Sequence, residues 1–140
     1  MATIGTVDLT RGTALSERIA AGPTAPAAAR ELVVGLFGDT TIAEESLHDL
    51  LLLTTELVTN AVRHSRAAEG GSVGLSIDVS KSAVSVAVTD PGGETSPRMQ
   101  ELDVDVPGGM GLFLVDQISE RWGVERAGAG AMRVWFELAR

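Results

Sequence analysis

The sequence predicts an α+β fold, a two-layer sandwich in which three helices cover one face of a mostly antiparallel, mixed sheet of four or five strands. Three stretches alternate apolar and polar residues with the two-residue period of a strand, and three others carry apolar residues at helical spacing. The elements follow the order helix, helix, strand, strand, long connection, helix, strand, strand. This order favours one helical layer packed on an antiparallel sheet.

The beginning of the chain carries the weakest signals. Residues 1–13 have mixed polarity and are interpreted as an N-terminal tail or an edge strand, and residues 14–21 are equally ambiguous. Residues 14–140 are predicted to form a single domain. The chain has 140 residues, of which 44% are hydrophobic, and this is enough to bury one core.

Two helices are expected before the first clear strand. Thr24 is the expected N-cap of the first helix, which covers residues 26–37 and ends at Gly38. The second helix is expected to begin after a threonine at positions 40–41 and to run to about Ser65. Both carry their apolar residues on one face, as a helix packed on a core does.

Four strands are expected in two pairs. Residues 73–79 and 84–88 alternate large apolar residues with small or polar ones, and Lys81–Ser82 forms a tight connection between them. This pair is predicted to be an antiparallel hairpin with one covered face. Residues 122–126 and 132–138 form the expected second pair.

A long connection and the third helix lie between the two strand pairs. Residues 94–107 are polar, with four acidic side chains, and are interpreted as a lid. The third helix follows this lid and is expected to end near Arg121. Trp122 and Trp135 are expected to anchor the core or a sheet face.

The charge of the chain restricts its partners. It has 11 basic and 19 acidic residues, which give a net charge of −8. Such a surface repels nucleic acid and anionic membranes, so a phosphate site must be local and built from backbone N–H groups, a helix N-terminus and a metal ion. The chain has no cysteine, no apolar run near the roughly 18 residues of a membrane helix, and no signal-peptide pattern, so a cytoplasmic location is expected.

Three polar residues interrupt the apolar second helix at intervals of four. Glu56, Asn60 and His64 therefore share one helix face. A carboxylate can act as a general base, and an amide carbonyl is a hard oxygen ligand suited to Mg²⁺. The pair Glu56 and Asn60 thus indicates metal-assisted phosphate chemistry. The alternative for this stripe taken alone is a set of solvated or capping residues.

Two glycine-bearing segments strengthen the first interpretation. Asp90-Pro91-Gly92-Gly93 ends the second strand, and Gly108-Gly109-Met110-Gly111-Leu112 leads into the third helix. Small residues before a helix expose backbone N–H groups at its positive end, which suits a phosphate. The alternatives are an ordinary turn for the first segment and a simple glycine-rich loop for the second.

Together the three segments resemble the N box, G1 box and G2 box of the GHKL superfamily of ATP-binding domains. The sequence of residues 56–64 is similar to that of bacterial anti-sigma factor serine/threonine kinases; it reads Glu-Leu-Val-Thr-Asn-Ala-Val-Arg-His. The resemblance covers about residues 14–139 and implies a histidine-kinase-type ATPase fold that binds ATP and Mg²⁺. It implies that Glu56 is the catalytic residue, polarising the attacking hydroxyl or water, and that Asn60 binds the metal. The residues that it implies for cofactor binding are Asn60, Arg63, His64, Asp90, Gly92, Gly108, Gly109, Met110, Gly111 and Leu112.

Within this set, the resemblance implies that Asp90 accepts a hydrogen bond from the adenine amino group. Guanine presents a carbonyl at that position, so two acceptors would face each other. Arg63 and His64 have a structural alternative, because positive charge is stabilised near a helix C-terminus. The side chain of Leu112 is expected in the core. The chain departs from the G1 pattern at Glu94, where the family usually has a second glycine.

The resemblance implies a regulator that sequesters a sigma factor and phosphorylates a serine or threonine of an anti-anti-sigma partner of the STAS type. It also implies a homodimer, with no direct contact to nucleic acid or membrane. One alternative is an ATP-binding partner-switching module without significant kinase turnover, which Glu94 favours. Another is a detached histidine-kinase catalytic domain, although the chain has no helical hairpin carrying a phosphoacceptor histidine.

Overall fold

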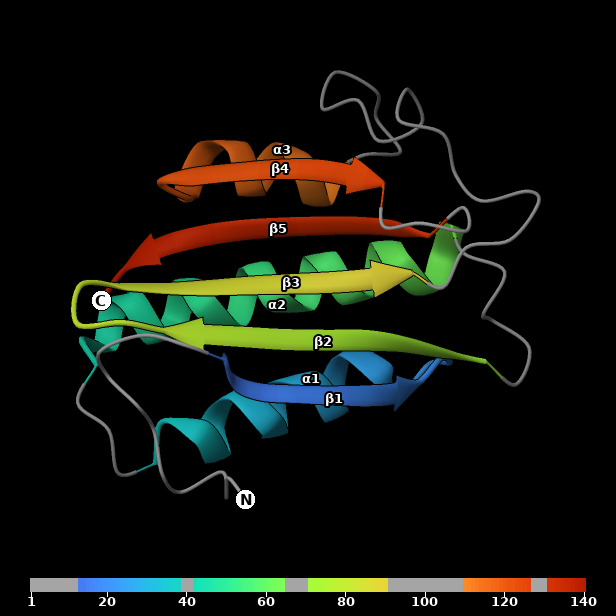
Figure 1. Cartoon of the computed structure of the whole chain (residues 1–140), viewed down its shortest axis with the longest axis horizontal. Helices are drawn as coiled ribbons and strands as arrows, with labels where there is room; N and C mark the ends of the chain where they lie inside the picture. Colours follow the sequence, from blue (N-terminus) through green and yellow to red (C-terminus); the bar gives the residue numbers. More distant parts are fainter. Residues whose placement is uncertain (1–12, 39–41, 65–70, 91–109, 127–130) are drawn as a thin grey trace.

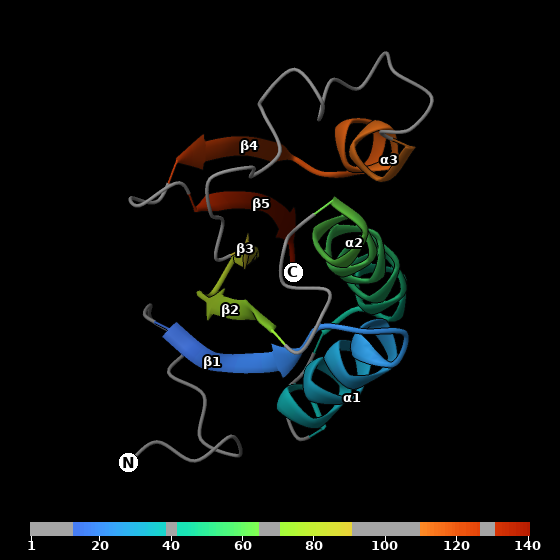
Figure 2. The same cartoon turned by 90° about the vertical axis from the view of Figure 1, so that its right-hand side faces the viewer.

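The computed structural model describes residues 13–38, 42–64, 71–90, 110–126 and 131–140. These residues form five strands and three helices in two layers, with the helices side by side on one face of the sheet (Figures 1 and 2). The predicted two-layer α+β architecture is confirmed. The elements in chain order are β1 (Thr13–Ala20), α1 (Ala25–Leu36), α2 (Glu44–His64), β2 (Ser72–Val79), β3 (Ala83–Asp90), α3 (Met110–Ile118), β4 (Arg121–Arg126) and β5 (Met132–Ala139).

The sheet has the strand order β1-β2-β3-β5-β4. All four pairings between these strands are antiparallel. The last strand, β5, lies between β3 and β4, so α3 carries the chain from the middle of the sheet to its edge (Figure 1). The predicted hairpin of β2 and β3 is therefore present, the two later strands pair as a second hairpin, and β5 joins the two hairpins into one sheet.

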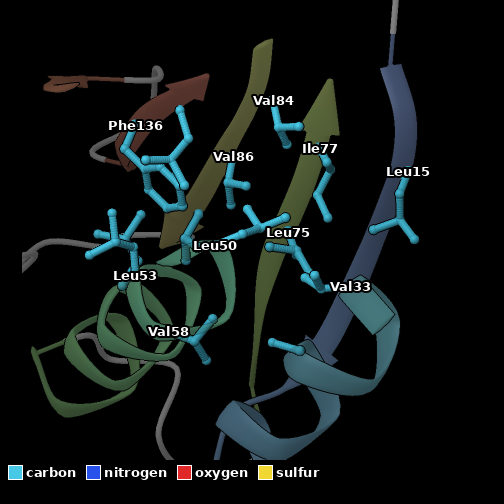
Figure 3. Close-up of a cluster of buried hydrophobic side chains, with 14 of the residues drawn as sticks. Leu15, Val33, Leu50, Leu53, Val58, Leu75, Ile77, Val84, Val86 and Phe136 are labelled. Atoms are coloured by element: carbon cyan, nitrogen blue, oxygen red, sulfur yellow. The ribbon is translucent and has the colours of Figure 1, made fainter. Parts of the chain in front are cut away.

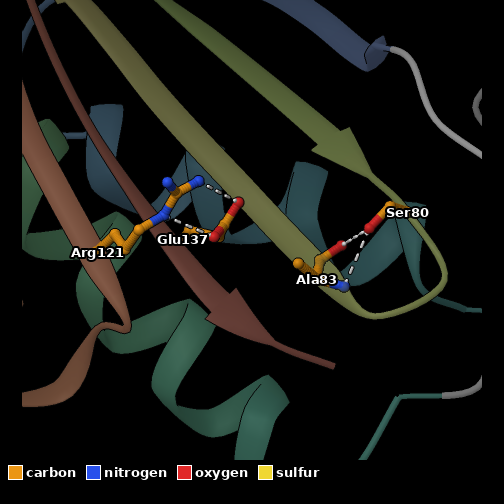
Figure 4. A network of polar contacts seen from close by, with 4 residues as sticks. All are labelled: Ser80, Ala83, Arg121 and Glu137. Atoms are coloured by element: carbon orange, nitrogen blue, oxygen red, sulfur yellow. Dashed lines mark hydrogen bonds and ion pairs between the residues drawn. The ribbon is translucent and has the colours of Figure 1, made fainter.

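The turn between β2 and β3 is closed by a serine. The backbone N–H of Ser80 donates to the carbonyl of Ala83 at 2.9 Å. The Ala83 N–H donates to the Ser80 hydroxyl oxygen at 3.1 Å, and that hydroxyl donates to the Ala83 carbonyl oxygen at 3.3 Å (Figure 4). The serine hydroxyl thus accepts from the N–H of the turn in place of a backbone carbonyl, at the point where hydrogen bonding between the two strands ends. The tight connection predicted at Lys81–Ser82 is confirmed.

The ambiguous N-terminal stretch is an edge strand. Leu15 and Ile19 are buried, but Glu17, which has the same strand parity and lies between them, is exposed. Because Glu17 is charged, the two-residue alternation of a strand is lost. The two apolar residues that remain, Leu15 and Ile19, are four apart, a spacing that fits a helix as well as a strand. Pairing of β1 with β2 decides the conformation. Residues 1–12, the rest of the expected tail or edge strand, lie outside the described residues.

The helix ends differ slightly from those expected. Thr24 is the N-cap of α1, but its side chain makes no capping hydrogen bond. Helix α3 ends at Ile118 rather than near Arg121, because Arg121 already pairs with Glu137 in the sheet. The threonines at 40–41 lie outside the described residues.

One hydrophobic core fills the space between the helices and the sheet. Leu50, Leu53 and Val58 of α2 face apolar residues of the central strands, and Phe136 of β5 is fully buried among them (Figure 3). Val33 adds the contribution of α1. The alternating apolar residues predicted for β2, β3 and β5 therefore face the helices, as one covered sheet face requires.

The two tryptophans lie on opposite faces of the sheet. Trp122 stands opposite Phe136 and packs against the core, whereas Trp135 stands opposite Gly123 on the other face. A Cβ atom on Gly123 would lie 2.8 Å from Trp135 Nε1, closer than real contacts allow. Glycine at 123 therefore makes room for the indole ring.

Two adjacent threonines of α2 provide a test of the packing. The Thr54 hydroxyl is fully buried and has no hydrogen-bond partner among the described residues, whereas the Thr55 hydroxyl donates to Leu51 O at 2.7 Å and accepts from Arg30 at 3.1 Å. Thr54→Val is expected to raise the free energy of unfolding by about 1 kcal/mol, because it removes an unpaired buried hydroxyl without changing the side-chain shape.

Thr55→Val is the matched control, with the same change of residue type one position along the same helix. It is expected to leave the free energy of unfolding unchanged or to lower it by up to about 1 kcal/mol, because satisfied hydrogen bonds are lost. Urea denaturation of both variants measures the difference. Equal destabilisation by the two substitutions would contradict the assigned environment of Thr54.

Candidate functional site

The polar stripe predicted on the second helix lies on one continuous helix, α2, which extends from Glu44 to His64. Glu56 and Asn60 are therefore one turn apart on the same face, as are Asn60 and His64. Glu56 is half-buried and Arg63 is exposed, while the side chain of His64 lies outside the described residues. The two residues expected to do chemistry are thus neighbours with different environments.

Asn60 has a buried amide that lacks a partner. The residue is only 8% exposed, and its Nδ2 atom makes no hydrogen bond to any described residue. A buried polar atom in this state costs about 1–3 kcal/mol, and binding of a ligand to the amide would remove this cost. A half-turn of the amide exchanges Oδ1 and Nδ2, which lets the group offer either a donor or a hard oxygen ligand.

A divalent metal here would depend on Asn60 and on a bound phosphate. No group of three or more His, Cys, Asp or Glu side chains gathers in the described part of the chain. Mg²⁺ usually takes only one or two ligands from a protein and the rest from phosphates and water. One buried amide therefore fits the chemistry of this ion, whereas an all-protein metal cage has no basis among the described residues.

Asp90 is the last residue of β3, opposite Met132 of β5, and it is 5% exposed. The C-terminal end of β3, the C-terminal end of α2 and the start of α3 lie at the same end of the molecule (Figure 1). Helix α2 packs against both β3 and α3. The structure therefore brings the elements that carry the three predicted segments to one end of the domain.

Helix α3 begins within the predicted phosphate loop. Met110 and Gly111 are its first residues, and Leu112 is fully buried in the core, as expected for its side chain. The positive end of this helix lies where the loop residues enter it, which suits an anion. Gly92, Gly108, Gly109, Glu94 and the expected lid at 94–107 lie outside the described residues.

One polar contact at α3 was not predicted from the sequence. The indole N–H of Trp122 on β4 donates to Asp116 Oδ1 at 2.9 Å. The two residues are six apart and lie on either side of a helix–strand junction, so neither the helical nor the strand period relates them. Only the packing of α3 beside β4 brings them together.

The described helices contain no segment that is both long and apolar enough to cross a membrane. The half-buried carboxylate of Glu56 and the buried amide of Asn60 share one face of α2, and the buried carboxylate of Asp90 ends β3, a strand against which α2 packs. A site of this composition can bind a polar ligand, accept a proton and hold a hard cation.

Comparisons with known proteins identify the fold independently. Among solved structures, the chain is similar to the RsbU and RsbW domains of Rv1364c from Mycobacterium tuberculosis, with a TM-score of 0.66 and 17% identity. That match covers 90% of this chain and 33% of the other, so this chain spans about one third of its length and shares its fold. No curated protein matches. A family model for the histidine kinase-like ATPase domain matches residues 19–137, and the chain belongs to this family.

Proposed function

We propose that the chain is an ATP- and Mg²⁺-dependent serine/threonine protein kinase that acts as an anti-sigma factor. Membership of the histidine kinase-like ATPase family supports ATP as the nucleotide. The observation that carries the proposal is the buried amide of Asn60, whose Nδ2 atom has no partner in the described part of the chain, one helical turn from the half-buried carboxylate of Glu56. A general base and an oxygen ligand for Mg²⁺ that lie one helical turn apart suit the transfer of phosphate.

In this proposal Glu56 is the general base. Its carboxylate accepts the proton of the substrate hydroxyl, and the hydroxyl oxygen forms a bond to the γ-phosphorus of ATP. The bond between that phosphorus and the bridging oxygen breaks, and ADP leaves with the electron pair. Phosphoryl transfer requires mainly positioning and charge stabilisation, so a few well-placed groups are sufficient.

The same proposal assigns Asn60 as the protein ligand of Mg²⁺. When bound, this ion neutralises charge on the phosphate oxygens. The backbone positions of Asn60 and Glu56 are fixed relative to each other, one turn apart, because both residues belong to one helix. Arg63 is exposed at the same end of α2, where its guanidinium adds positive charge for the phosphates.

Asp90 is proposed to select adenine. Its carboxylate, at the end of β3, accepts a hydrogen bond from the exocyclic amino group, and guanine offers a carbonyl oxygen there instead. Burial strengthens this discrimination, since an unpaired acceptor in a water-poor site is costly. The backbone N–H groups of residues 108–111, the last two of which begin α3, are proposed to bind the phosphates.

The proposed protein partners are a sigma factor, which the chain sequesters, and an anti-anti-sigma protein of the STAS type, whose serine or threonine receives the phosphate. A homodimer is proposed as its assembly. Support comes from the sequence of residues 56–64, which resembles anti-sigma factor kinases, and from the fold shared with the RsbW domain. The net charge of −8 agrees with protein partners rather than nucleic acid.

The proposal is tested by nucleotide binding and phosphate transfer with the same preparation. Calorimetry should detect ATP binding that is weakened when Mg²⁺ is removed, with ATP preferred over GTP by more than about tenfold. Asp90→Asn should lose most of this preference, because its amide N–H₂ can donate to the guanine carbonyl. No binding of millimolar ATP by the folded chain would overturn the proposal.

The transfer step is tested with γ-labelled ATP and STAS-type proteins of the same organism. Label on the partner that is stable to acid indicates a serine or threonine phosphoester and supports the kinase. Acid-labile label indicates a phosphohistidine and a histidine-kinase catalytic domain instead. Nucleotide binding without label on any partner would favour the alternative suggested by Glu94, a partner-switching module without significant turnover.

A further inference from the structure

Helix α3 connects the proposed phosphate site to the edge of the sheet. It begins at Met110, within the predicted G2 segment, and ends at Ile118, and two residues separate it from β4. The Ser119 N–H donates to Val115 O at 2.9 Å and closes the last turn of the helix, and the Glu120 N–H donates to Glu137 O of β5 at 2.8 Å, so the chain just after the helix end is bonded to the sheet. The position of its first turn therefore depends on how the whole helix is held.

Helix α3 is held mainly by apolar packing. It has nine residues, fewer than an isolated helix needs to be stable in water, so its orientation depends on tertiary contacts. Leu112 and Val115 are buried in the core, Leu114 and Ile118 are partly buried against it, and Phe113 is 51% exposed. Apolar packing has no preferred direction, so it fixes the distance of the helix from the core better than its tilt.

The contact between Asp116 and Trp122 adds a directional constraint to this apolar packing. Trp122 is itself fixed, because its ring packs against the core and its backbone pairs with Phe136. Its N–H reaches Asp116, an exposed residue at the border of the buried face of α3. A hydrogen bond to a carboxylate is stronger and more directional than one between neutral groups. This hydrogen bond therefore links the side of α3 that carries Asp116 to the edge strand β4.

The length of α3 converts a small tilt into a displacement at the site. Nine residues extend about 13 Å, so a tilt of about 5° moves the first turn by about 1 Å. Misplacing groups that bind or react by about 1 Å is enough to impair a site. The N–H groups at the start of α3 are aimed by the orientation of the helix, because their directions follow the helix axis.

We propose that Asp116 and Trp122 are positioning residues for the phosphate-binding end of α3, and that their hydrogen bond sets the affinity of the domain for the triphosphate of ATP. This inference rests on the proposed function, since it assigns a supporting pair to the same nucleotide site. Neither residue touches the nucleotide, and their effect passes through the orientation of the helix.

The test compares three substitutions with a matched control. Asp116→Ala removes the acceptor, Trp122→Phe removes the N–H but keeps an aromatic ring, and Asp116→Asn keeps an acceptor oxygen. The control, Glu125→Ala, removes an exposed carboxylate of β4 that pairs with Arg133 at 3.2 Å. All proteins are measured for ATP affinity by calorimetry, for KM and kcat of phosphate transfer, and for thermal unfolding without nucleotide.

Asp116→Ala and Trp122→Phe are each expected to raise the Kd and KM for ATP about five- to tenfold, with kcat at saturating ATP within about twofold of wild type. Asp116→Asn and Glu125→Ala should stay within about twofold in all three constants. The double variant Asp116→Ala/Trp122→Phe should be no worse than either single variant, because both remove the same bond.

Wild-type ATP affinity in Asp116→Ala, whether or not its unfolding temperature falls, would overturn the inference while leaving the proposed function intact. Additive losses in the double variant would also overturn it, because the two residues would then act separately. Absence of ATP binding by the folded wild-type protein would overturn the proposed function and this inference with it.

Discussion

Replacing Glu56 by alanine is expected to lower the rate of phosphate transfer about 10²- to 10⁴-fold, the usual contribution of a general base. ATP affinity should stay within about threefold of wild type, because the carboxylate contacts the attacking hydroxyl rather than the nucleotide. The half-buried position of Glu56 leaves it able to reach a substrate while Asn60, one turn further, is buried. Transfer of label and calorimetry on the same variant measure the two effects.

Two controls define the role of this carboxylate. Glu56→Gln keeps the shape and the hydrogen-bonding capacity but cannot accept the proton, so it should lose transfer as Glu56→Ala does. Glu45→Ala removes an exposed glutamate from the first turn of the same helix and should retain full transfer. Parallel loss of ATP binding and transfer in Glu56→Ala would instead assign the residue to nucleotide binding.

Replacing Asn60 by alanine is expected to abolish the Mg²⁺ dependence of ATP binding and to weaken binding in the presence of Mg²⁺ by at least about 10- to 100-fold. Losses of that size follow from removing even a supporting partner of a metal ligand. The free energy of unfolding should be unchanged or higher, because the unpaired buried Nδ2 atom is removed as well. Loss of function without loss of stability separates a ligand from a structural core residue.

Asn60→Asp serves as the conservative variant. A carboxylate is also an oxygen ligand for Mg²⁺, so this variant should recover part of the metal-dependent binding. Without metal it should be less stable than Asn60→Ala, since burial of an unpaired charge is costly. Reduced stability in Asn60→Ala, together with unaltered Mg²⁺ dependence, would contradict the proposed metal site.

The local periods of the sequence were sufficient for most secondary structure. Residues 73–79 alternate so regularly that the strand and its buried face follow directly, and the structure confirms them. The second helix could be placed because its apolar residues keep helical spacing over many turns. The conformation of residues 14–21 could not be predicted in this way. Exposed Glu17 interrupts the alternation of apolar and polar residues, and the strand that pairs with this edge strand lies far along the chain.

Part of the candidate site could be predicted from the sequence, and part depends on the tertiary structure. The spacing of Glu56 and Asn60 on one helix face follows from the sequence, since helical geometry fixes neighbours at i and i+4. The assignments of Gly92, Gly108 and Gly109 remain predictions from the resemblance. The sequence did not reveal that Asn60 is buried, with its Nδ2 atom lacking a partner among the residues that the structure describes, because burial depends on what other elements cover.

The sequence by itself determined the α+β class, the helical face that carries Glu56 and Asn60, and the antiparallel hairpin of residues 73–88. These features depend on residues close together in the chain, where one period or one turn sets the geometry. Only the tertiary structure decided that β5 lies between β3 and β4, that Trp122 faces the core and Trp135 the opposite face, and that Trp122 bonds to Asp116. Strand order and contacts between elements arise from packing across the whole domain, which no local pattern encodes.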